Sequence, residues 1–168
     1  MKGGQKLFQS ISISVLAGLC IFPIFAYLFS QEDLLKVECS INPLRPARGE
    51  EGKVVLKISV EKGISISPLP SLTIEFDPGE ELIFPKNFFT ASDLNIEVLE
   101  ENGEEYLNLK KPLVIPFTVS PKAKRGIHTL EGKVKYFARS KKEGWCLKRS
   151  FRFSATYYTR ITAVKKRP

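Results

Sequence analysis

The sequence predicts an all-β chain, an antiparallel β-sandwich preceded by one hydrophobic N-terminal helix. Three observations predict it: an uncharged apolar run near the start, apolar and polar residues that alternate after residue 31, and turn motifs between the alternating rows. Alternation with period two places successive side chains on opposite faces of a strand, so each row indicates a strand with one buried face. The 168 residues suit one targeting segment, residues 1–30, and one domain, residues 31–168.

The N-terminal run from Leu7 to Phe29 contains no Lys, Arg, Asp or Glu. A membrane-spanning helix needs about 20 apolar residues, whereas the core of a signal peptide needs only about 7–15. The length therefore favours an uncleaved signal anchor. A signal peptide cleaved after Ser30 is one alternative, although Leu28 stands where a small residue is required. A lipoprotein modified at Cys20 is another, although Leu19 precedes that cysteine.

The charges that flank this run predict its orientation in a membrane. Lys2 and Lys6 precede it, and Glu32 and Asp33 follow it. Positively charged flanks stay on the cytoplasmic side. We therefore expect the domain to lie outside the cytoplasm, on the periplasmic or extracytoplasmic side.

Six alternating rows follow, and a further strand is expected around Leu35–Cys39. The rows begin at Leu56, Leu72, Leu94, Leu113, Leu130 and Phe151. Nine apolar side chains in them are expected to face inward: Leu56, Ile58, Ile74, Ile96, Ile115, Phe117, Val134, Tyr136 and Phe153.

Turn motifs separate the rows. Asn102-Gly103 predicts a type I′ hairpin, because both residues tolerate positive φ. Arg48-Gly49, Asp77-Pro78-Gly79, Arg125-Gly126 and Glu143-Gly144 indicate further turns. Short strands with a turn every ten residues or so favour an immunoglobulin-like sandwich.

Charge is distributed unevenly along the domain. Residues 31–120 hold 9 Lys and Arg against 16 Asp and Glu, a balance of −7, and residues 121–168 hold 15 against 2, a balance of +13. Such asymmetry suits an acidic partner or an anionic lipid surface. It equally suits strands with solvated basic faces, because the cations alternate with apolar residues. Nucleic acid is not expected as a partner outside the cytoplasm.

Few residues have the character of catalytic or metal-binding groups. His128 is the only histidine, which excludes a multi-histidine metal site, and we expect it to be a half-buried strand residue. Asp77, Glu80 and Glu81 cluster at a turn without the spacing of an EF-hand. No cofactor is expected, and the residues leave open whether the protein is an enzyme.

The two cysteines of the domain, Cys39 and Cys146, allow two interpretations. Outside the cytoplasm they could form a structural disulfide between the first strand and the last hairpin. Alternatively, Cys146 is an exposed thiol that exchanges with a partner, activated by the cations around it: Lys141, Lys142, Lys148 and Arg149.

The stretch Gly126–Phe153, GIHTLEGKVKYFARSKKEGWCLKRSFRF, resembles the end of the N-terminal domain of DsbD-type thiol:disulfide interchange proteins. The upstream features that fit are an apolar loop at Gly63–Leu69, Phe84-Pro85, an acidic hairpin and the Leu113–Val119 strand. The resemblance covers nearly all of residues 36–160, and its specific motif is the final hairpin.

The resemblance implies an immunoglobulin-like domain outside the membrane that passes reducing equivalents to periplasmic partners by dithiol/disulfide exchange. Cys146 matches the second cysteine of that family, and the first would lie at Arg139 or Ser140, neither of which is a thiol. Two-electron exchange needs a second, resolving thiol.

We therefore expect a redox-impaired binding or accessory module for a protein partner, which the resemblance places in envelope thiol-redox or assembly processes. In one alternative the domain is active in exchange, with Cys39 as the partner of Cys146. In another it is a structural envelope domain whose basic edge contacts anionic lipid or a protein.

Overall fold

The computed structural model describes residues 34–161, and all regular secondary structure in this range is β-strand. The expected anchor and N-terminal helix, residues 1–30, lie outside the described residues. Within residues 34–161, no helix is long and apolar enough to cross a membrane.

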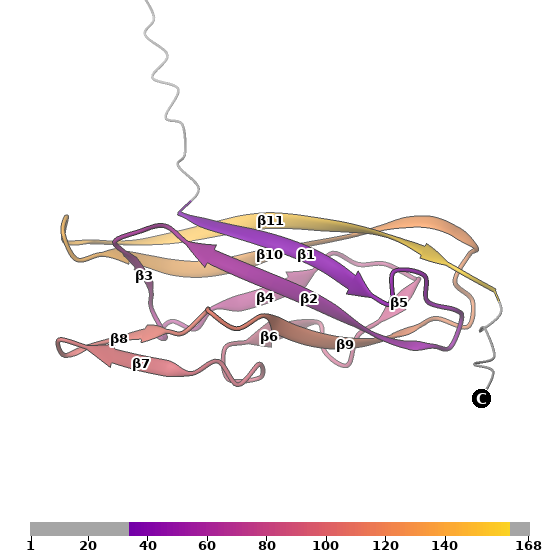
Figure 1. Ribbon diagram of the computed structural model, residues 1–168, viewed down its shortest axis with the longest axis horizontal. Helices are drawn as coiled ribbons and strands as arrows, with labels where there is room; N and C mark the ends of the chain where they lie inside the picture. The colour runs from indigo at the N-terminus through magenta and orange to yellow at the C-terminus, as the bar shows by residue number, and fades with distance from the viewer. Residues whose placement is uncertain (1–33, 162–168) are drawn as a thin grey trace, which may run out of the picture. The chain divides into compact units, whose positions relative to one another are not determined.

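The first sheet has the strand order β1-β2-β9-β5, and every neighbouring pair is antiparallel (Figure 1). Its strands are β1 (Leu35–Asn42), β2 (Glu51–Val60), β9 (Leu113–Val119) and β5 (Leu82–Ile83). The predicted strand near Leu35–Cys39 is therefore confirmed as β1.

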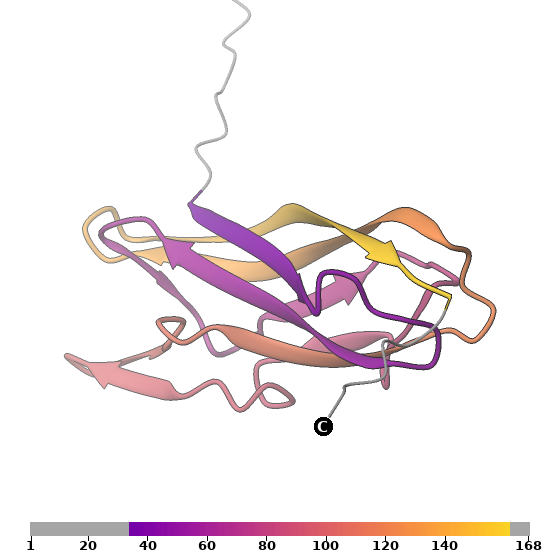
Figure 2. The ribbon, with the colours of Figure 1, turned by 45° about the vertical axis from the view of Figure 1, so that its right-hand side comes forward.

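The second sheet has the order β11-β10-β4-β6, and β3 pairs with the C-terminal end of β10. Its strands are β11 (Trp145–Thr159), β10 (Gly126–Ser140), β4 (Thr73–Phe76), β6 (Phe88–Thr90) and β3 (Ile64–Ile66). The 15-residue strands β10 and β11 form a long hairpin that runs along the domain (Figures 1 and 2).

A separate two-stranded hairpin joins β7 (Val98–Glu101) to β8 (Glu104–Leu107). Asn102 and Gly103 both have positive φ, 55° and 78°, as a type I′ turn requires. The predicted hairpin is confirmed.

One hydrophobic core joins the two sheets. Eight of the nine side chains predicted to face inward are buried, and Ile96 is half-buried against the same core. A chain of aromatic contacts crosses from β9 to β11: Phe117 contacts Phe84, Phe84 stacks on Phe76 at 4.1 Å, and Phe76 meets the edge of Phe153. Burial of these alternating apolar side chains holds the sheets together.

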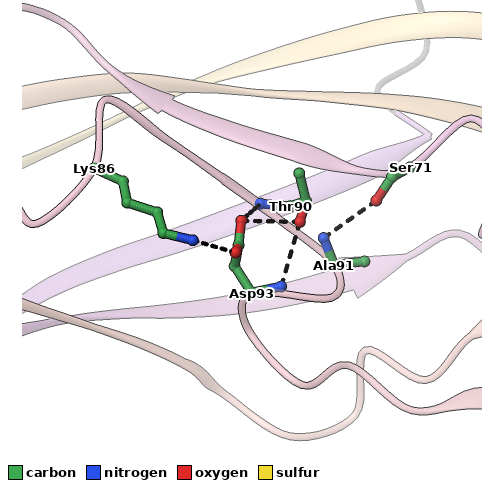
Figure 3. A network of polar contacts seen from close by, with 5 residues as sticks. All are labelled: Ser71, Lys86, Thr90, Ala91 and Asp93. Carbon is green, nitrogen blue, oxygen red and sulfur yellow. Dashed lines mark hydrogen bonds and ion pairs between the residues drawn. The ribbon is translucent and has the colours of Figure 1, made fainter.

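The strand expected from Leu94 to Val98 is largely absent. Residues 91–95 form a turn, and strand β7 begins only at Val98. The Asp93 carboxylate folds back to accept hydrogen bonds from the Thr90 backbone amide and hydroxyl, at 3.0 and 2.9 Å, and from the Lys86 ammonium (Figure 3). Local bonds from Asp and Thr side chains compete with strand pairing. Alternation alone did not predict this turn, which is why the strand prediction was wrong here.

Candidate functional site: the thiol hairpin

The β10–β11 hairpin holds Cys146 near its tip. The two strands pair without interruption from Gly126↔Thr159 to Ser140↔Trp145. Residues 141–144 form the turn, closed by a hydrogen bond from the Gly144 amide to the Ser140 carbonyl at 2.9 Å. Gly144 has φ 72°, a conformation that glycine adopts without steric cost. The Trp145 indole donates to the Glu143 carboxylate, which ties the first residue of β11 to the turn.

Arg139 lies directly opposite Cys146 in the hairpin. At the other end of β11, the Tyr158 amide points away from β10 and donates to Leu44. Amides alternate in direction along a strand, so the Cys146 amide also points away from β10. Arg139 and Cys146 therefore form a non-hydrogen-bonded pair, whose Cα atoms lie about 4.5 Å apart in antiparallel sheets.

Ser140, the residue after Arg139, faces the opposite side of the sheet. It pairs with Trp145, its side chain is buried, and its hydroxyl accepts a hydrogen bond from the Glu143 amide. Of the two candidate positions, only residue 139 shares a face with Cys146.

Cys39 lies in the other sheet, on the inward face of β1 opposite Leu56. It is half-buried and packs against the core. Burial raises the pKa of its thiol from the ordinary 9.0 to about 11. At neutral pH this thiol is protonated, and a protonated thiol is a poor nucleophile.

Among the described residues, Cys39 and Cys146 form no disulfide with each other, and both are free thiols. Cys146 is exposed on the outward face of its sheet, whereas Cys39 points into the sandwich. The hairpin tip extends past the first residue of β1 in both views (Figures 1 and 2). Cys39 lies four residues further along β1, roughly 13 Å from that start. A disulfide requires Cα atoms within about 7 Å.

The cations expected around Cys146 do not all lie beside its thiol. Lys141 donates to the Glu101 carbonyl at 3.0 Å and pairs with Glu104 at 3.3 Å. Arg149 lies on the inward face, opposite Tyr136. Lys148, two residues from Cys146, stays exposed on the thiol's own face.

A surface hollow of about 390 Å³ opens beside Arg139, and sequence reasoning missed it. Its walls come from the apolar loop after β3 and from the acidic hairpin β7–β8: Ser67, Pro68, Leu69, Glu100, Gly103, Glu104 and Glu105. Leu69 is 75% exposed there. The opposite charges of the two hairpins were the signal in the sequence that could have placed them together.

His128 is a half-buried strand residue, as predicted. One ring nitrogen, Nε2, lies 2.8 Å from the Lys124 carbonyl, and Nδ1 lies 3.7 Å from Glu81. Its ring sits 5.5 Å from that of Tyr157, whose pKa is raised to about 12 by burial and by the charge of Glu81. The histidine thus links the β10 strand to two loops.

Comparison with known proteins gives no relative from which to transfer a function. No protein-family model matches the chain, and no curated protein matches it significantly.

Proposed function

We propose that this protein is a membrane-anchored, extracytoplasmic, immunoglobulin-like domain that binds a protein partner and is impaired in redox catalysis. It is related in this proposal to the N-terminal domain of DsbD-type proteins, and acts as an accessory module in envelope thiol-redox or assembly processes. The anchor and the location rest on the uncharged Leu7–Phe29 run and its flanking charges.

The strand orders support the immunoglobulin-like part of the proposal. Immunoglobulin domains place strands A, B, E and D in one sheet and C, F and G in the other. The order β1-β2-β9-β5 corresponds to A-B-E-D, and β11-β10-β4 corresponds to G-F-C. The hairpin that carries Cys146 is then the F–G hairpin, the last in the domain.

The observation that carries the proposal is the exposed thiol of Cys146 facing Arg139 where a dithiol site needs a second cysteine. The Cys146 thiolate can attack one sulfur of a partner's disulfide. The partner's S–S bond breaks, a mixed S–S bond forms, and the displaced sulfur leaves as a thiolate that takes up a proton. Release of the partner in reduced form needs a second thiolate to attack Cys146.

Cys39 does not fit the role of that second thiolate. It lies in the other sheet, roughly 13 Å inside the start of β1, and its pKa is raised to about 11. The position of Cys39 in the other sheet and its raised pKa support the redox-impaired proposal over the alternative in which Cys146 and Cys39 form an exchanging pair.

In the test, the pre-reduced full chain in neutral detergent is exposed to excess oxidised glutathione, and the masses of the products are determined by mass spectrometry. The full chain also carries Cys20, so the position of each glutathione is mapped; the proposal predicts that, of the two cysteines of the domain, only Cys146 holds a glutathione, and that this adduct is absent from Cys146→Ser. An intramolecular Cys39–Cys146 disulfide formed with release of both glutathiones would overturn it. The Arg139→Cys variant is the matched positive control, because it restores a second thiol.

A further inference from the structure

The outer edge of β11 is open along most of its length. β11 is the first strand of its sheet and pairs with β10 on one side only. On the other side, in the described part of the chain, only its last residues have backbone partners: the Tyr158 amide donates to Leu44 at 3.1 Å, and Arg160, just beyond the strand, pairs with Pro46 and Arg48. β1 lies alongside but belongs to the other sheet.

The bond at Tyr158 fixes which backbone groups face outward along the edge. In an antiparallel ladder the N–H and C=O of one residue point to the same side, and the direction alternates along the strand. Every second residue before Tyr158 therefore presents an amide and a carbonyl that have no backbone partner within residues 34–161, although the Lys148 carbonyl accepts a hydrogen bond from the Arg149 guanidinium at 3.3 Å. These residues are Cys146, Lys148, Ser150, Arg152, Ser154 and Thr156. At its end this edge already pairs with the backbone of segment 44–48, through an isolated parallel bridge between Ala47 and Arg160.

The side chains of the same residues make the edge basic. All six point outward and are exposed; two of them, Lys148 and Arg152, are cations, and none is a carboxylate. Arg152 has one acidic neighbour, Asp77 at 3.6 Å, and its side chain is still 73% exposed. On β10, by contrast, Lys133 and Lys135 are both engaged by Glu75. Lys148 and Arg152 therefore present exposed positive charge beside the open edge.

Apolar side chains line the inner side of this edge. Leu147 and Phe151 alternate with the outward residues and are half-buried. On the neighbouring strand β1, Val37 is half-buried and faces the core. A strand added to β11 would present every second side chain to these groups and cover them.

We propose that the outer edge of β11 binds an extended segment of a partner polypeptide by strand addition, with acidic residues at alternate positions and apolar residues between them. The acidic side chains lie beside Lys148 and Arg152, and the apolar ones cover Phe151 and Leu147. Main-chain bonds along the edge supply affinity and the alternating side chains supply specificity. This inference deepens the proposed binding role, on which it rests, and does not require the thiol of Cys146.

The probe for the test is a synthetic ten-residue peptide that alternates glutamate and valine, with a lysine–valine peptide as its control. Binding to the full chain in neutral detergent is followed by fluorescence anisotropy and by amide hydrogen exchange. We expect the glutamate peptide to slow exchange of the outward-facing amides between residues 146 and 156 about tenfold or more. The alternate amides, already bonded to β10, stay unchanged.

Two pairs of variants separate main-chain pairing from charge attraction. Ser150→Pro removes one outward amide that has no backbone partner in residues 34–161, whereas Ser150→Ala keeps that amide. Only the proline variant should bind about tenfold more weakly. Lys148→Glu combined with Arg152→Glu should weaken binding by a similar factor. Lys53→Glu combined with Lys57→Glu makes the same charge change on exposed positions of β2, in the other sheet, and should leave binding unchanged.

Control peptides keep the test decisive if a protein variant fails to fold. Methylating the peptide amides along one edge should abolish binding for only one of the two possible methylation patterns. Equal binding of both patterns, or protection away from β11, overturns strand addition. If, without peptide, the outward-facing amides of β11 exchange more slowly as the protein concentration rises, the edge binds a second copy of the chain. That result also overturns the proposal. Retained binding by Cys146→Ser separates this surface from the thiol chemistry.

Discussion

Arg139 and Cys146 face each other across the β10–β11 hairpin as a non-hydrogen-bonded pair on the outward side of the sheet. Cross-strand positions of this kind lie within the Cα separation of 4.4–6.8 Å typical of disulfides. The neighbouring pair, Ser140 and Trp145, points to the other face.

Arg139→Cys should therefore form a disulfide with Cys146 under mild oxidation. Ser140→Cys is the matched control, because its side chain is buried on the opposite face and should leave Cys146 free. Free-thiol titration and intact mass before and after dithiothreitol measure the outcome. Equal oxidation of the two variants would show that the register of the hairpin differs from that described.

The sequence predicted the long, regular strands and the turns with strong local chemistry, because alternation and glycine act locally. It did not predict β5 and β6, which have two and three residues and owe their pairing to distant strands. At the candidate site, the proposed resemblance leaves two positions for a second cysteine, Arg139 and Ser140. The choice between them depends on the register set by the turn at 141–144, since a shift of one residue reverses every side chain.

Phe117→Ala should lower the free energy of unfolding by about 3–5 kcal/mol, as truncation of fully buried aromatic residues does. Phe117 is 2% exposed and contacts Phe84, through which it joins the aromatic chain to β11. Val114→Ala, on the same strand but 48% exposed, is the control and should cost far less. Urea unfolding of the full chain in neutral detergent measures both; a loss below about 1 kcal/mol for Phe117→Ala would contradict its place in the core.

The free energy of unfolding of the domain should fall in strongly acidic solution as the Asp93 carboxylate becomes protonated. The Lys86 ammonium and the Thr90 amide and hydroxyl lower the pKa of its carboxyl from 3.8 to about 2. Because the folded-state pKa is depressed, the stabilising contribution is complete above the unfolded value and is lost as pH falls from about 3.8 through 2. Asp93→Asn should remove this component, which urea unfolding across that range detects. An NMR titration that placed the carboxyl's pKa near 3.8 in the folded protein would rule out the described network.

The two thiols of the domain, Cys39 and Cys146, should differ in their reaction with iodoacetamide. Exposed Cys146 should be alkylated readily in the folded chain, whereas Cys39 is half-buried and has a pKa of about 11. A pKa two units above the ordinary 9.0 reduces the thiolate fraction at neutral pH about a hundredfold, and burial restricts the reagent further. Mass mapping of Cys39→Ser and Cys146→Ser over time distinguishes the sites.

The pH dependence of the free energy of unfolding gives an independent check that Cys39 is buried and has a raised pKa. Because burial raises the folded-state pKa of Cys39, the folded state resists ionisation: its stability is unaffected below the unfolded value near 9 and declines as pH rises toward 11. Cys39→Ser should lose that decline, and Cys146→Ser should keep it. Alkylation of Cys39 as fast as Cys146 at pH 8, in the folded chain, would place Cys39 at the surface. That result would reopen the exchange reaction between the two cysteines.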